Sequence, residues 1–490
     1  MAQDSEVFRR EQPGLQPGVD IAPALRRVGV VRKFGGTSVM DGARIREVAR
    51  LIEELGAGGS LVVVSAMAGV TDALLGLGEE ARRGAIDEAQ RLAARLAQRH
   101  HQAIVDLQLT GGDGRNDAGA LTERALHETL EASLLRWREI ANGAALLGDL
   151  SPKSTDELLA TGEMLSSRLL AAALEARGVE VRWVDPREVL ITDSRFGRAE
   201  PDVSAIRERA REILSPPLMT GATVVTGGFV GAARSGETTT LGRGGSDLSA
   251  ALLAAAIGAP ELEIWTDVDG VMTADPRQVP EARRVPVLSY AEASELAFFG
   301  AKVLHPATLR PAVTAGIPVR IRNTFAPNGE GTRIAGGVAG AGVTAISARG
   351  GAAALFLTNP RMLLAPGHAA RVFAVFERHG VAVDVIATSD VSISVTVDRG
   401  APLGELVREL GDHADVAVER GLAVVSIVGR RLRTTPRLAA RVFTAIDDVN
   451  VVLISQGASD TSLSFVVRED DAATTLARLH AALFPPRELV

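Results

Sequence analysis

The sequence predicts an α/β fold followed by two copies of a smaller α+β module. Short apolar runs such as Leu61–Val64 alternate with long amphipathic segments over the first two thirds of the chain. Glycine makes up 50 of 490 residues, above the typical ~7%, which favours many tight turns. In the C-terminal third, Ala369–Phe373 (AARVF) recurs with a period of 70 as Ala439–Phe443 (AARVF), which indicates an internal duplication.

The core is expected to begin with a strand, a glycine turn and a helix. Val28–Phe34 has the pattern of a short buried strand, and it leads into Gly35 and Gly36. A helix is predicted over Asp41–Leu55, because apolar residues recur there at helical spacing. Residues 1–28 are polar and proline-rich, so we expect a poorly ordered tail.

Further strands and helices follow in alternation. Leu61–Val64 predicts a buried parallel strand that ends in a loop of small residues. Two long, alanine-rich helices are predicted over Ala85–Leu107 and Leu121–Leu147, and two buried strands over Thr223–Thr226 and Leu262–Thr266. Ligands of open α/β sheets bind at the carboxyl ends of the strands, so we expect the site in the loops gathered there.

The duplication in the last third holds without a gap. Ser389-Asp390 matches Ser459-Asp460, and Ser392–Ser394 matches Ser462–Ser464. Each copy has the pattern of a strand, an amphipathic helix and two alternating strands, which predicts two copies of one α+β module. The glycine- and proline-rich stretch Asn323–Gly342 joins the core to the repeats.

Composition narrows the class of function. A net charge of −7 offers no basic surface for nucleic acid. The absence of cysteine excludes disulfides and thiolate chemistry. The longest apolar stretch, around Leu248–Ile257, is too short to span a membrane, and residues 1–28 carry no signal-peptide pattern. We therefore expect a cytoplasmic protein with no nucleic-acid or membrane partner.

Two glycine loops carry the charged residues of the candidate site. In the first, Lys33 precedes Gly35 and Gly36, and the hydroxyls of Thr37–Ser38 follow. Paired glycines let the backbone approach a phosphate, and the lysine adds a positive charge. The lysine precedes the glycines, so this is not a Walker A loop. With the second loop, Thr238–Asp247, it predicts a site for a phosphoryl donor and an acidic acceptor.

Four ordered blocks carry a family resemblance. They are Lys33–Val39 (KFGGTSV), Leu241–Asp247 (LGRGGSD), Ile264–Val271 (IWTDVDGV) and Phe299–Pro306 (FGAKVLHP). Together with the duplicated tail, these blocks resemble those of the aspartate kinases, over roughly Val28 to Leu483. One glycine loop alone is a weak signal, whereas four blocks in the family's order are a strong one.

The resemblance implies a three-layer α/β/α amino-acid-kinase sandwich, of the carbamate-kinase-like type, followed by two ferredoxin-like (βαββαβ) ACT domains. The expected domains are a flexible tail at 1–28, the catalytic domain at 29–327, a linker at 328–342, the first ACT domain region at 343–420 and the second ACT domain at 421–490. Because the chain ends at Val490, soon after the repeats, we expect no dehydrogenase unit after them.

The implied reaction is ATP-dependent phosphorylation of L-aspartate to 4-phospho-L-aspartate, the first step toward lysine, threonine and methionine. A carboxylate is already ionised at neutral pH, so catalysis rests on positioning two anions and neutralising their charge. By resemblance, Lys33 contacts the transferring phosphate and Asp247 orients the site. The residues expected to bind aspartate are Gly36, Thr37, Ser38, Thr71, Glu163 and Arg243. Those expected to bind ATP are Lys33, Gly35, Gly36, Thr266, Asp267, Met272, Arg277, Lys302 and Val303.

Within these sets, Arg243 suits a carboxylate, because a guanidinium can grip it through two hydrogen bonds, and Glu163 suits the α-ammonium group. Met272 departs from the tyrosine that close relatives often carry there, so we expect a modest change in nucleotide affinity. The eight histidines show no metal-ligand spacing. We therefore expect no metal held by the protein, only Mg²⁺ that arrives with ATP.

The first repeat resembles the effector pocket of lysine-sensitive aspartate kinases. The residues expected to line this pocket are Met362, Gly367, His368, Ala369, Val383, Asp384, Thr388, Ser389 and Asp390. Asp384 or Asp390 would bind the effector's ammonium group. The expected effector is lysine, with threonine as the alternative, because Ala365 replaces a serine of some lysine-inhibited relatives. ACT domains commonly pair, which implies a homodimer or homotetramer.

Other interpretations stay open at this stage. The chain could be a glutamate kinase of the same fold, since one methylene is a small energetic difference, or an amino-acid sensor with an inactive kinase core. Glu163 could be an ordinary surface or helix-start carboxylate, Asp267 and Asp269 turn formers, and Thr71 a helix cap. The two repeats could serve only to dimerise the protein.

Overall fold

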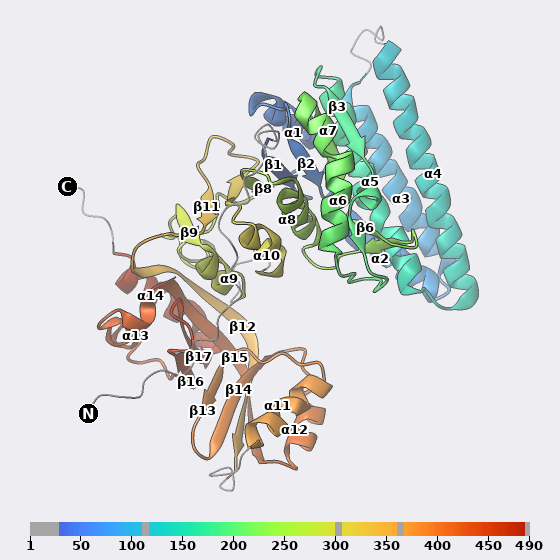
Figure 1. The fold of residues 1–490 in the computed structure, drawn as a ribbon. Coiled ribbons are helices and arrows are strands. Elements are labelled where there is room, and N and C mark those ends of the chain that lie inside the picture. The colour runs from blue at the N-terminus through green and yellow to red at the C-terminus, as the bar shows by residue number, and fades with distance from the viewer. Residues whose placement is uncertain (1–28, 110–116, 299–305, 360–366, 486–490) are drawn as a thin grey trace, which may run out of the picture.

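The computed structural model describes residues 29–109, 117–298, 306–359 and 367–485. Figure 1 shows a catalytic region, coloured blue to yellow, and a regulatory region, coloured orange to red, each built around its own sheet. Three of the expected site residues, Lys302, Val303 and Met362, lie outside the described residues.

The catalytic region is built on an eight-stranded sheet. All of its neighbouring strands run parallel except β10 and β11, which are antiparallel. Across the sheet the order is β3 (Val181–Val184), β5 (Thr223–Gly227), β2 (Leu61–Val64), β1 (Val31–Phe34), β8 (Leu262–Thr266), β10 (Val319–Asn323), β11 (Thr332–Ala335) and β9 (Val287–Ser289).

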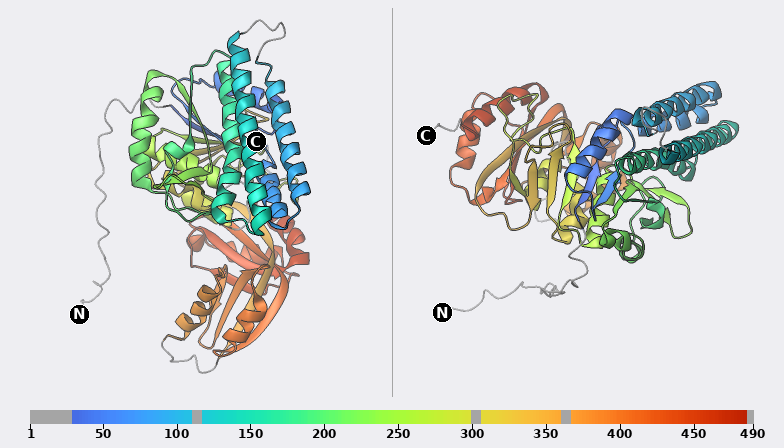
Figure 2. Two further views of the ribbon diagram at one scale, coloured as in Figure 1. Left: turned by 90° about the vertical axis from the view of Figure 1, so that its right-hand side faces the viewer. Right: turned by 90° about the horizontal axis from the view of Figure 1, so that it is seen from above.

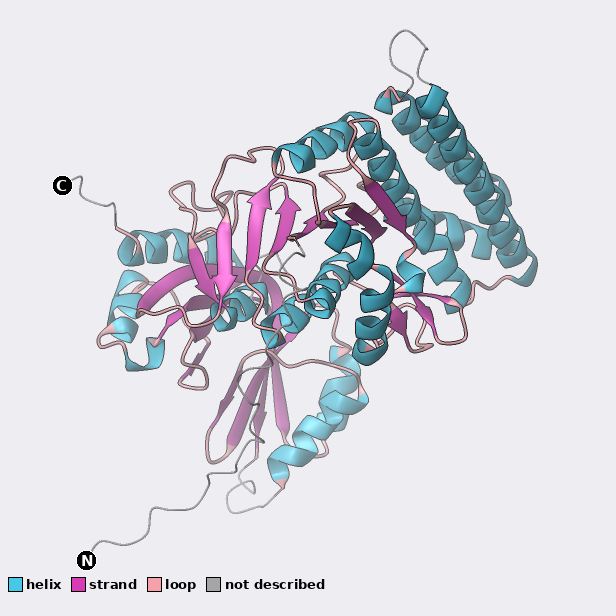
Figure 3. Ribbon diagram, turned by 45° about the horizontal axis from the view of Figure 1, so that its top comes forward, coloured by secondary structure: helices cyan, strands magenta, loops and turns pink. Residues whose placement is uncertain are grey.

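Helices cover both faces of this sheet, as Figures 2 and 3 show. One face packs against α1 (Gly42–Glu54), α2 (Val70–Arg82), α3 (Ile86–Leu107), α4 (Asp117–Leu147) and α5 (Pro152–Glu175). The other packs against α6 (Val203–Ile213), α7 (Ser215–Thr220), α8 (Gly245–Ile257), α9 (Tyr290–Phe298) and α10 (Pro306–Thr314). Strand β2 shows why: Val62 and Val64 enter one core, and Leu61 and Val63 the other.

The predicted elements of the core are found, with small changes at their ends. Strands β2 and β8 have the predicted bounds, while β1 begins at Val31 instead of Val28. Helix α1 begins at Gly42, because the Asp41 carboxylate caps it by accepting a hydrogen bond from Arg44 N (2.8 Å). The three-layer α/β/α expectation is confirmed.

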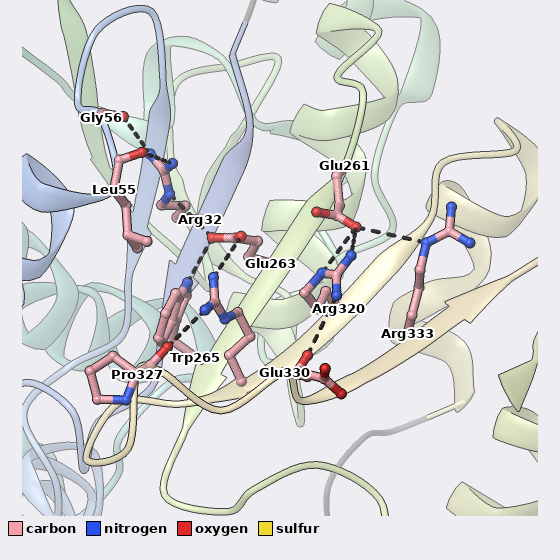
Figure 4. Close-up of polar contacts among 11 residues, drawn as sticks. Arg32, Leu55, Gly56, Glu261, Glu263, Trp265, Arg320, Pro327, Glu330 and Arg333 are labelled. Carbon is pink, nitrogen blue, oxygen red and sulfur yellow. Dashed lines mark hydrogen bonds and ion pairs between the residues drawn. The ribbon is translucent and has the colours of Figure 1, made fainter. Parts of the chain in front are cut away.

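A buried network of charges crosses the middle of the sheet (Figure 4). Glu263 on β8 accepts hydrogen bonds from Arg32 Nε on β1 (3.2 Å) and from Trp265 Nε1 (3.0 Å). Arg322 on β10 lies 3.4 Å from the other carboxylate oxygen and stacks over the Trp265 ring. Arg32 and Glu263 are each 6% exposed. One carboxylate therefore joins three strands of the sheet.

A small three-stranded sheet lies beside the main one and leads into the second glycine loop. Its order is β4 (Ile191–Thr192), β6 (Val230–Ala233) and β7 (Thr238–Thr240). The glycine loop joins β7 to α8, so the small sheet holds the start of that helix in place.

The regulatory region is one six-stranded sheet with two pairs of helices. Its strand order is β13 (Ile386–Thr388), β14 (Ser392–Asp398), β12 (Gly342–Thr358), β15 (Asp415–Arg430), β17 (Ser462–Arg468) and β16 (Leu453–Gln456). Helices α11 (His368–Arg378) and α12 (Leu403–Leu410) pack on one half, and α13 (Leu438–Ala445) and α14 (Ala472–Leu483) on the other. The repeat of strand, helix and two strands, with an added helix, is confirmed.

The long strands β12 and β15 differ from the expected boundary between the two modules. Residues 343–350, assigned to the first module from sequence, pair with 423–429, and Ile346 packs in the core of the second module. Residues 352–358 pair with β14 on one side and with 415–422 of β15 on the other, and Ala353, Leu355 and Leu357 pack in the first module. One half of β12 thus belongs to each module. The 70-residue repeat does not reveal this arrangement, because it depends on pairing between distant parts of the chain.

The stretch 328–342, expected to be a linker, also differs from the expectation. It contains β11, whose Thr332 and Ile334 are buried against the catalytic sheet. The two regions are joined further by Arg430, whose Nε lies 3.1 Å from the fully buried Glu292 of α9. Ile346 N donates to Thr273 O (2.8 Å), which attaches β12 to the catalytic region.

Candidate active site

Lys33 lies where β1 ends and the first glycine turn begins. Its Nζ is 2.6 Å from Asp247 Oδ1, and the lysine side chain is only 11% exposed. Gly35 N donates to Trp265 O (3.0 Å), which fixes the turn against β8. A Cβ on Gly36 would lie 2.8 Å from Ala66 O, so a side chain cannot be accommodated there. The turn therefore has to be glycine to hold Lys33 in this position.

The second glycine loop places Asp247 opposite this lysine. Gly242 and Gly244 have φ angles of 73° and 70°, in the left-handed region that favours glycine. Gly244 precedes the first turn of α8, which contains Asp247. Two glycines thus turn the chain sharply enough to bring the start of α8 against the end of β1.

A pocket of about 640 Å³ opens between these two loops. Six residues predicted from sequence line it together, although they come from β1, α2, α5 and the two glycine loops. They are Lys33, Gly36, Thr71, Glu163, Arg243 and Asp247. Arg243 is exposed and Glu163 is buried, so the pocket joins a solvated cation to a desolvated carboxylate.

Glu163 is the most perturbed group in the pocket. Burial raises its pKa to about 8, against the opposing effects of a backbone hydrogen bond from Ala66 and the charge of Lys33. Its Oε2 is buried with no hydrogen-bond partner. Glu163 is therefore neither a surface carboxylate nor a helix-start carboxylate, since it lies in the middle of α5, and its free oxygen can accept a cationic partner.

The remaining predicted aspartate-binding residues divide into two groups. Thr71 lines the pocket and does not cap α2, whose N-cap is Gly69. Thr37 and Ser38 are not among the pocket's lining residues, and the Ser38 hydroxyl forms a 2.7 Å hydrogen bond with Thr324 Oγ1. In this structure Ser38 thus joins the first glycine turn to the segment after β10.

A second pocket, of about 670 Å³, lies at the end of β8. Four predicted nucleotide-binding residues line it, namely Thr266, Asp267, Met272 and Arg277. Arg277 is paired with Asp275 at 2.6 Å, and its side chain is 74% exposed. Strand β12 of the regulatory region contributes the wall formed by 346–348. Gly35 does not line this pocket, and Asp269 accepts a hydrogen bond from Asn323 Nδ2 (2.8 Å).

Sequence reasoning missed Asp156 and Phe229, which also line the first pocket. Asp156 is fully buried and accepts hydrogen bonds from the backbone of Gly197 and Thr240. Phe229 has a φ of 64°, unusual for a residue with a side chain, and its N–H donates to Ser249 Oγ (2.9 Å). A signal for Asp156 was available, because it lies seven residues before Glu163 on the same helix.

The residues predicted to bind an effector lie around the start of α11 and the strands β13 and β14. Asp384 contacts Arg349, which also lies 2.8 Å from Asp398. The Asp384 side chain is 4% exposed, and burial raises its pKa, although the neighbouring Arg349 opposes the shift. Ser389 is hydrogen-bonded to Ser392 Oγ (2.7 Å). Asp384 therefore already has a cationic partner in this structure.

The other predicted effector residues surround this pair. Gly367, with a φ of 79°, is the N-cap of α11, and His368 is buried in its first turn. Ala369, Thr388 and Asp390 are exposed, while Val383 is partly buried.

Comparison with known proteins agrees with this arrangement. The model of the amino acid kinase family matches residues 29–323, and a model of the ACT domain matches 358–401 and 425–483. The lysine-sensitive aspartokinase 3 of Escherichia coli is 39% identical over 93% of this chain and 99% of its own. A chloroplastic aspartokinase 1 of Arabidopsis thaliana is 34% identical over 94% of this chain and 81% of its own.

Solved structures match along the same length. The structure of E. coli aspartokinase III in complex with aspartate and ADP, in its R-state, has a TM-score of 0.77 at 38% identity. It matches over 93% of this chain and all of its own. The T-state complex of that enzyme with lysine and aspartate has a TM-score of 0.75 at 37% identity.

The fold and the pocket, with its glycine loops and Lys33–Asp247 pair, define an amino acid kinase that carries C-terminal ACT domains. Within this class, the chain belongs to the aspartokinases.

Among the described residues, no helix is both long and apolar enough to cross a membrane.

Proposed function

We propose that this aspartokinase transfers the γ-phosphoryl group of ATP to the side-chain carboxylate of L-aspartate. The observation that carries the proposal is one pocket that combines the Lys33–Asp247 pair with Arg243 and the buried Glu163. The complex of the E. coli relative with aspartate and ADP supports the same pair of ligands. A cation for a carboxylate and a carboxylate for an ammonium group together suit an amino acid.

In this proposal each side chain has a distinct task. Glu163 binds the α-ammonium group of aspartate, and Arg243 binds a carboxylate. The side-chain carboxylate oxygen then attacks the γ-phosphorus as the bond to the ADP oxygen breaks. Lys33 stabilises the negative charge on the transferring group, and Asp247 holds Lys33 in place. No proton is transferred, because the nucleophile is already an anion.

The second pocket is the proposed place of the nucleotide. Thr266, Asp267, Met272 and Arg277 line it beside the end of β8, next to the first glycine turn. The proposed nucleotide site also includes Lys302 and Val303, and Lys33, Gly35 and Gly36 at the first glycine turn. Mg²⁺ is proposed to arrive with ATP and to neutralise phosphate charge. The proposed location of the enzyme is the cytoplasm, as expected from the sequence.

We also propose feedback inhibition through the first ACT module, with lysine as the effector and threonine as the alternative. The T-state complex of the E. coli relative with lysine supports this choice. The effector's ammonium group would compete with Arg349 for Asp384, since the two side chains are in contact. A homodimer or homotetramer formed through the regulatory sheet is the proposed assembly.

The experiment traps the product. Incubation with ATP, Mg²⁺ and aspartate in the presence of hydroxylamine should convert the acyl phosphate to a hydroxamate that forms a coloured ferric complex. Arg243→Lys keeps the charge but loses the two-pronged grip, so the KM for aspartate should rise about tenfold or more, with little change for ATP. No hydroxamate from the unchanged enzyme would reject the proposal and favour an amino-acid sensor.

A further inference from the structure

The segment 271–285 lies in the catalytic part of the sequence, but part of it packs in the second regulatory module. Met272 and Arg277 of this segment line the second pocket. Ala274 and Val279 are buried in the same core as the leucines of α14. Figure 1 shows α14 at the end of the regulatory region that faces the catalytic region. The segment that carries two proposed nucleotide residues therefore shares a core with the C-terminal helix.

Thr273 forms the buried polar contact between this segment and α14. Its hydroxyl is hydrogen-bonded to His480 Nε2 (2.9 Å) and accepts from Arg283 N (2.9 Å). Thr273 is 8% exposed and His480 is 2% exposed. Met272 and Ala274 line the second pocket, whereas Thr273 does not. The Thr273 side chain is thus turned away from the pocket, toward the C-terminal helix.

The end of α14 holds the other side of the segment as well. Arg283 Nη2 donates to the backbone oxygens of Phe484 and Pro485, both at 2.9 Å. The Phe484 ring stacks on His480, with 4.9 Å between the ring centroids. Thr273 N also donates to Arg283 O (2.8 Å). Two paired positions of the segment are therefore attached to the same helix end.

We propose that the second ACT module is a structural part of the nucleotide site and that His480 acts there as a positioning residue. Through its hydrogen bond to Thr273, His480 fixes one wall of the second pocket. The proposal deepens the proposed function, in which the nucleotide binds in that pocket. Strand β12 adds to the support, because Ile346 N donates to Thr273 O (2.8 Å). The two modules then differ in role: the first binds the effector, and the second supports the site of the phosphoryl donor.

The test compares His480→Phe with His480→Gln. Phenylalanine keeps a ring against Phe484 but loses the nitrogen that bonds Thr273. Burial and the charge of Arg283 lower the pKa of His480, so its imidazole is neutral near pH 7. The uncharged glutamine amide can therefore keep the hydrogen bond to Thr273.

The effect should be confined to the nucleotide. In His480→Phe we expect the KM for ATP, and the Kd for ADP measured by calorimetry, to rise about fivefold to tenfold. In His480→Gln both should stay within about twofold of wild type. The KM for aspartate should change by less than about twofold in either variant, because the first pocket is not touched.

A second pair of variants covers the case in which His480→Phe does not fold. Thr273→Val removes the same hydrogen bond from the other side and should raise the KM for ATP by a similar factor. Thr273→Ser keeps the hydroxyl and should restore the wild-type value. His100→Phe is the matched control, since His100 is also buried and hydrogen-bonded, to Leu96 O (2.8 Å), but lines neither pocket.

A purely structural role would give a different pattern. The proposal is overturned if His480→Phe or Thr273→Val lowers thermal stability while the KM for ATP stays unchanged. It is also overturned if the KM values for ATP and aspartate rise equally, or if His100→Phe raises the KM for ATP as much. Failure of the proposed nucleotide site is distinguishable, because Arg277→Gln, within the pocket itself, would then leave the KM for ATP unchanged.

Discussion

Two neighbouring basic residues of β1 have opposite surroundings. Lys33 points into the first pocket and pairs with Asp247 at 2.6 Å. Arg32, on the other face of the strand, is enclosed by Glu263 and the backbone oxygens at the end of α1 (Figure 4). Both cations have a carboxylate partner and both are largely buried.

The difference lies in what surrounds each pair. Around Lys33, glycine turns replace side chains and leave a cavity of about 640 Å³. Around Arg32, the ring of Trp265 and the guanidinium of Arg322 fill the remaining space. A buried ion pair thus stabilises the sheet where other side chains fill the space around it. It can take part in catalysis where the neighbouring backbone leaves space for a ligand.

The largest effect is expected at Lys33, where a substitution should lower turnover with little change in stability. Lys33→Met keeps the length of the side chain but removes the charge that stabilises the transferring phosphoryl group. We expect turnover to fall about 10³-fold or more, because catalysis of this transfer is mainly electrostatic. ADP release measures the rate, and the midpoint of thermal unfolding should move little. A rate within tenfold of wild type would remove Lys33 from the mechanism.

The opposite effect, a loss of stability, is expected at the buried Arg32–Glu263 ion pair. Glu263→Gln leaves Arg32 and Arg322 without their shared carboxylate, and burial already lowers the pKa of Arg32. Breaking such a buried pair typically costs about 3–5 kcal/mol. Urea unfolding of the catalytic region should show the loss, whereas Glu261→Gln, a more exposed neighbour in Figure 4, is the milder control. Unchanged stability would contradict the role of the network.

A pH dependence is expected from Glu163, whose pKa burial raises to about 8. Below pH 8 the free enzyme holds Glu163 protonated, and the ammonium group of aspartate favours its ionised form, so binding releases a proton. The KM for aspartate should fall as pH rises from 6 to 8, by up to about tenfold per pH unit, and then level off. The same raised pKa stabilises the fold at low pH, and this contribution is lost as pH rises through 8.

Calorimetry in buffers of different ionisation enthalpy counts the released protons. Glu163→Gln should abolish the release. Proton release that persists in that variant would show that another group titrates.

Loss of feedback inhibition is expected from Asp384→Asn. The ion pair with Arg349 is weakened, and so is the site proposed for the effector's ammonium group. The lysine concentration for half inhibition should rise about tenfold, a typical size for an allosteric coupling. Asp398→Asn is the matched control, because Asp398 contacts the same arginine but is 67% exposed. Equal effects of both variants would reject the assignment of the pocket.

The smallest effect is expected at Met272, which lines the second pocket. An aromatic ring in its place would stack on the adenine, so Met272→Tyr should lower the KM for ATP by about twofold to fivefold. Met219→Tyr, at an exposed position on α7, serves as the control. A change in the KM for aspartate instead would place Met272 in the other pocket.

The elements that could be predicted from the sequence are those whose structure is determined by residues close together in the chain. Leu61–Val64 is apolar at every position because both faces of β2 are covered, so the strand was placed with the correct bounds. The two glycine loops could be recognised because only glycine allows such turns. The glycine loops predicted a site that includes Lys33, whereas Glu163 and Arg243 were assigned to it only through the resemblance to the aspartate kinases.

Non-local pairing could not be predicted in the same way. Nothing in the sequence of 343–350 indicates that this half of β12 packs with the second module, because its place depends on its pairing with 423–429. Helical spacing places Asp156 on the same face of α5 as Glu163, but its hydrogen-bond partners, 41 and 84 residues away, could not be predicted from that spacing.

The most direct test of the account measures ADP release by the unchanged enzyme with Mg²⁺, ATP and either aspartate or glutamate, each with and without lysine or threonine. We predict rapid release with aspartate, little with glutamate, and suppression by lysine. Release with glutamate alone would contradict the assigned substrate, and release with aspartate that neither amino acid suppresses would contradict the regulatory role of the C-terminal sheet.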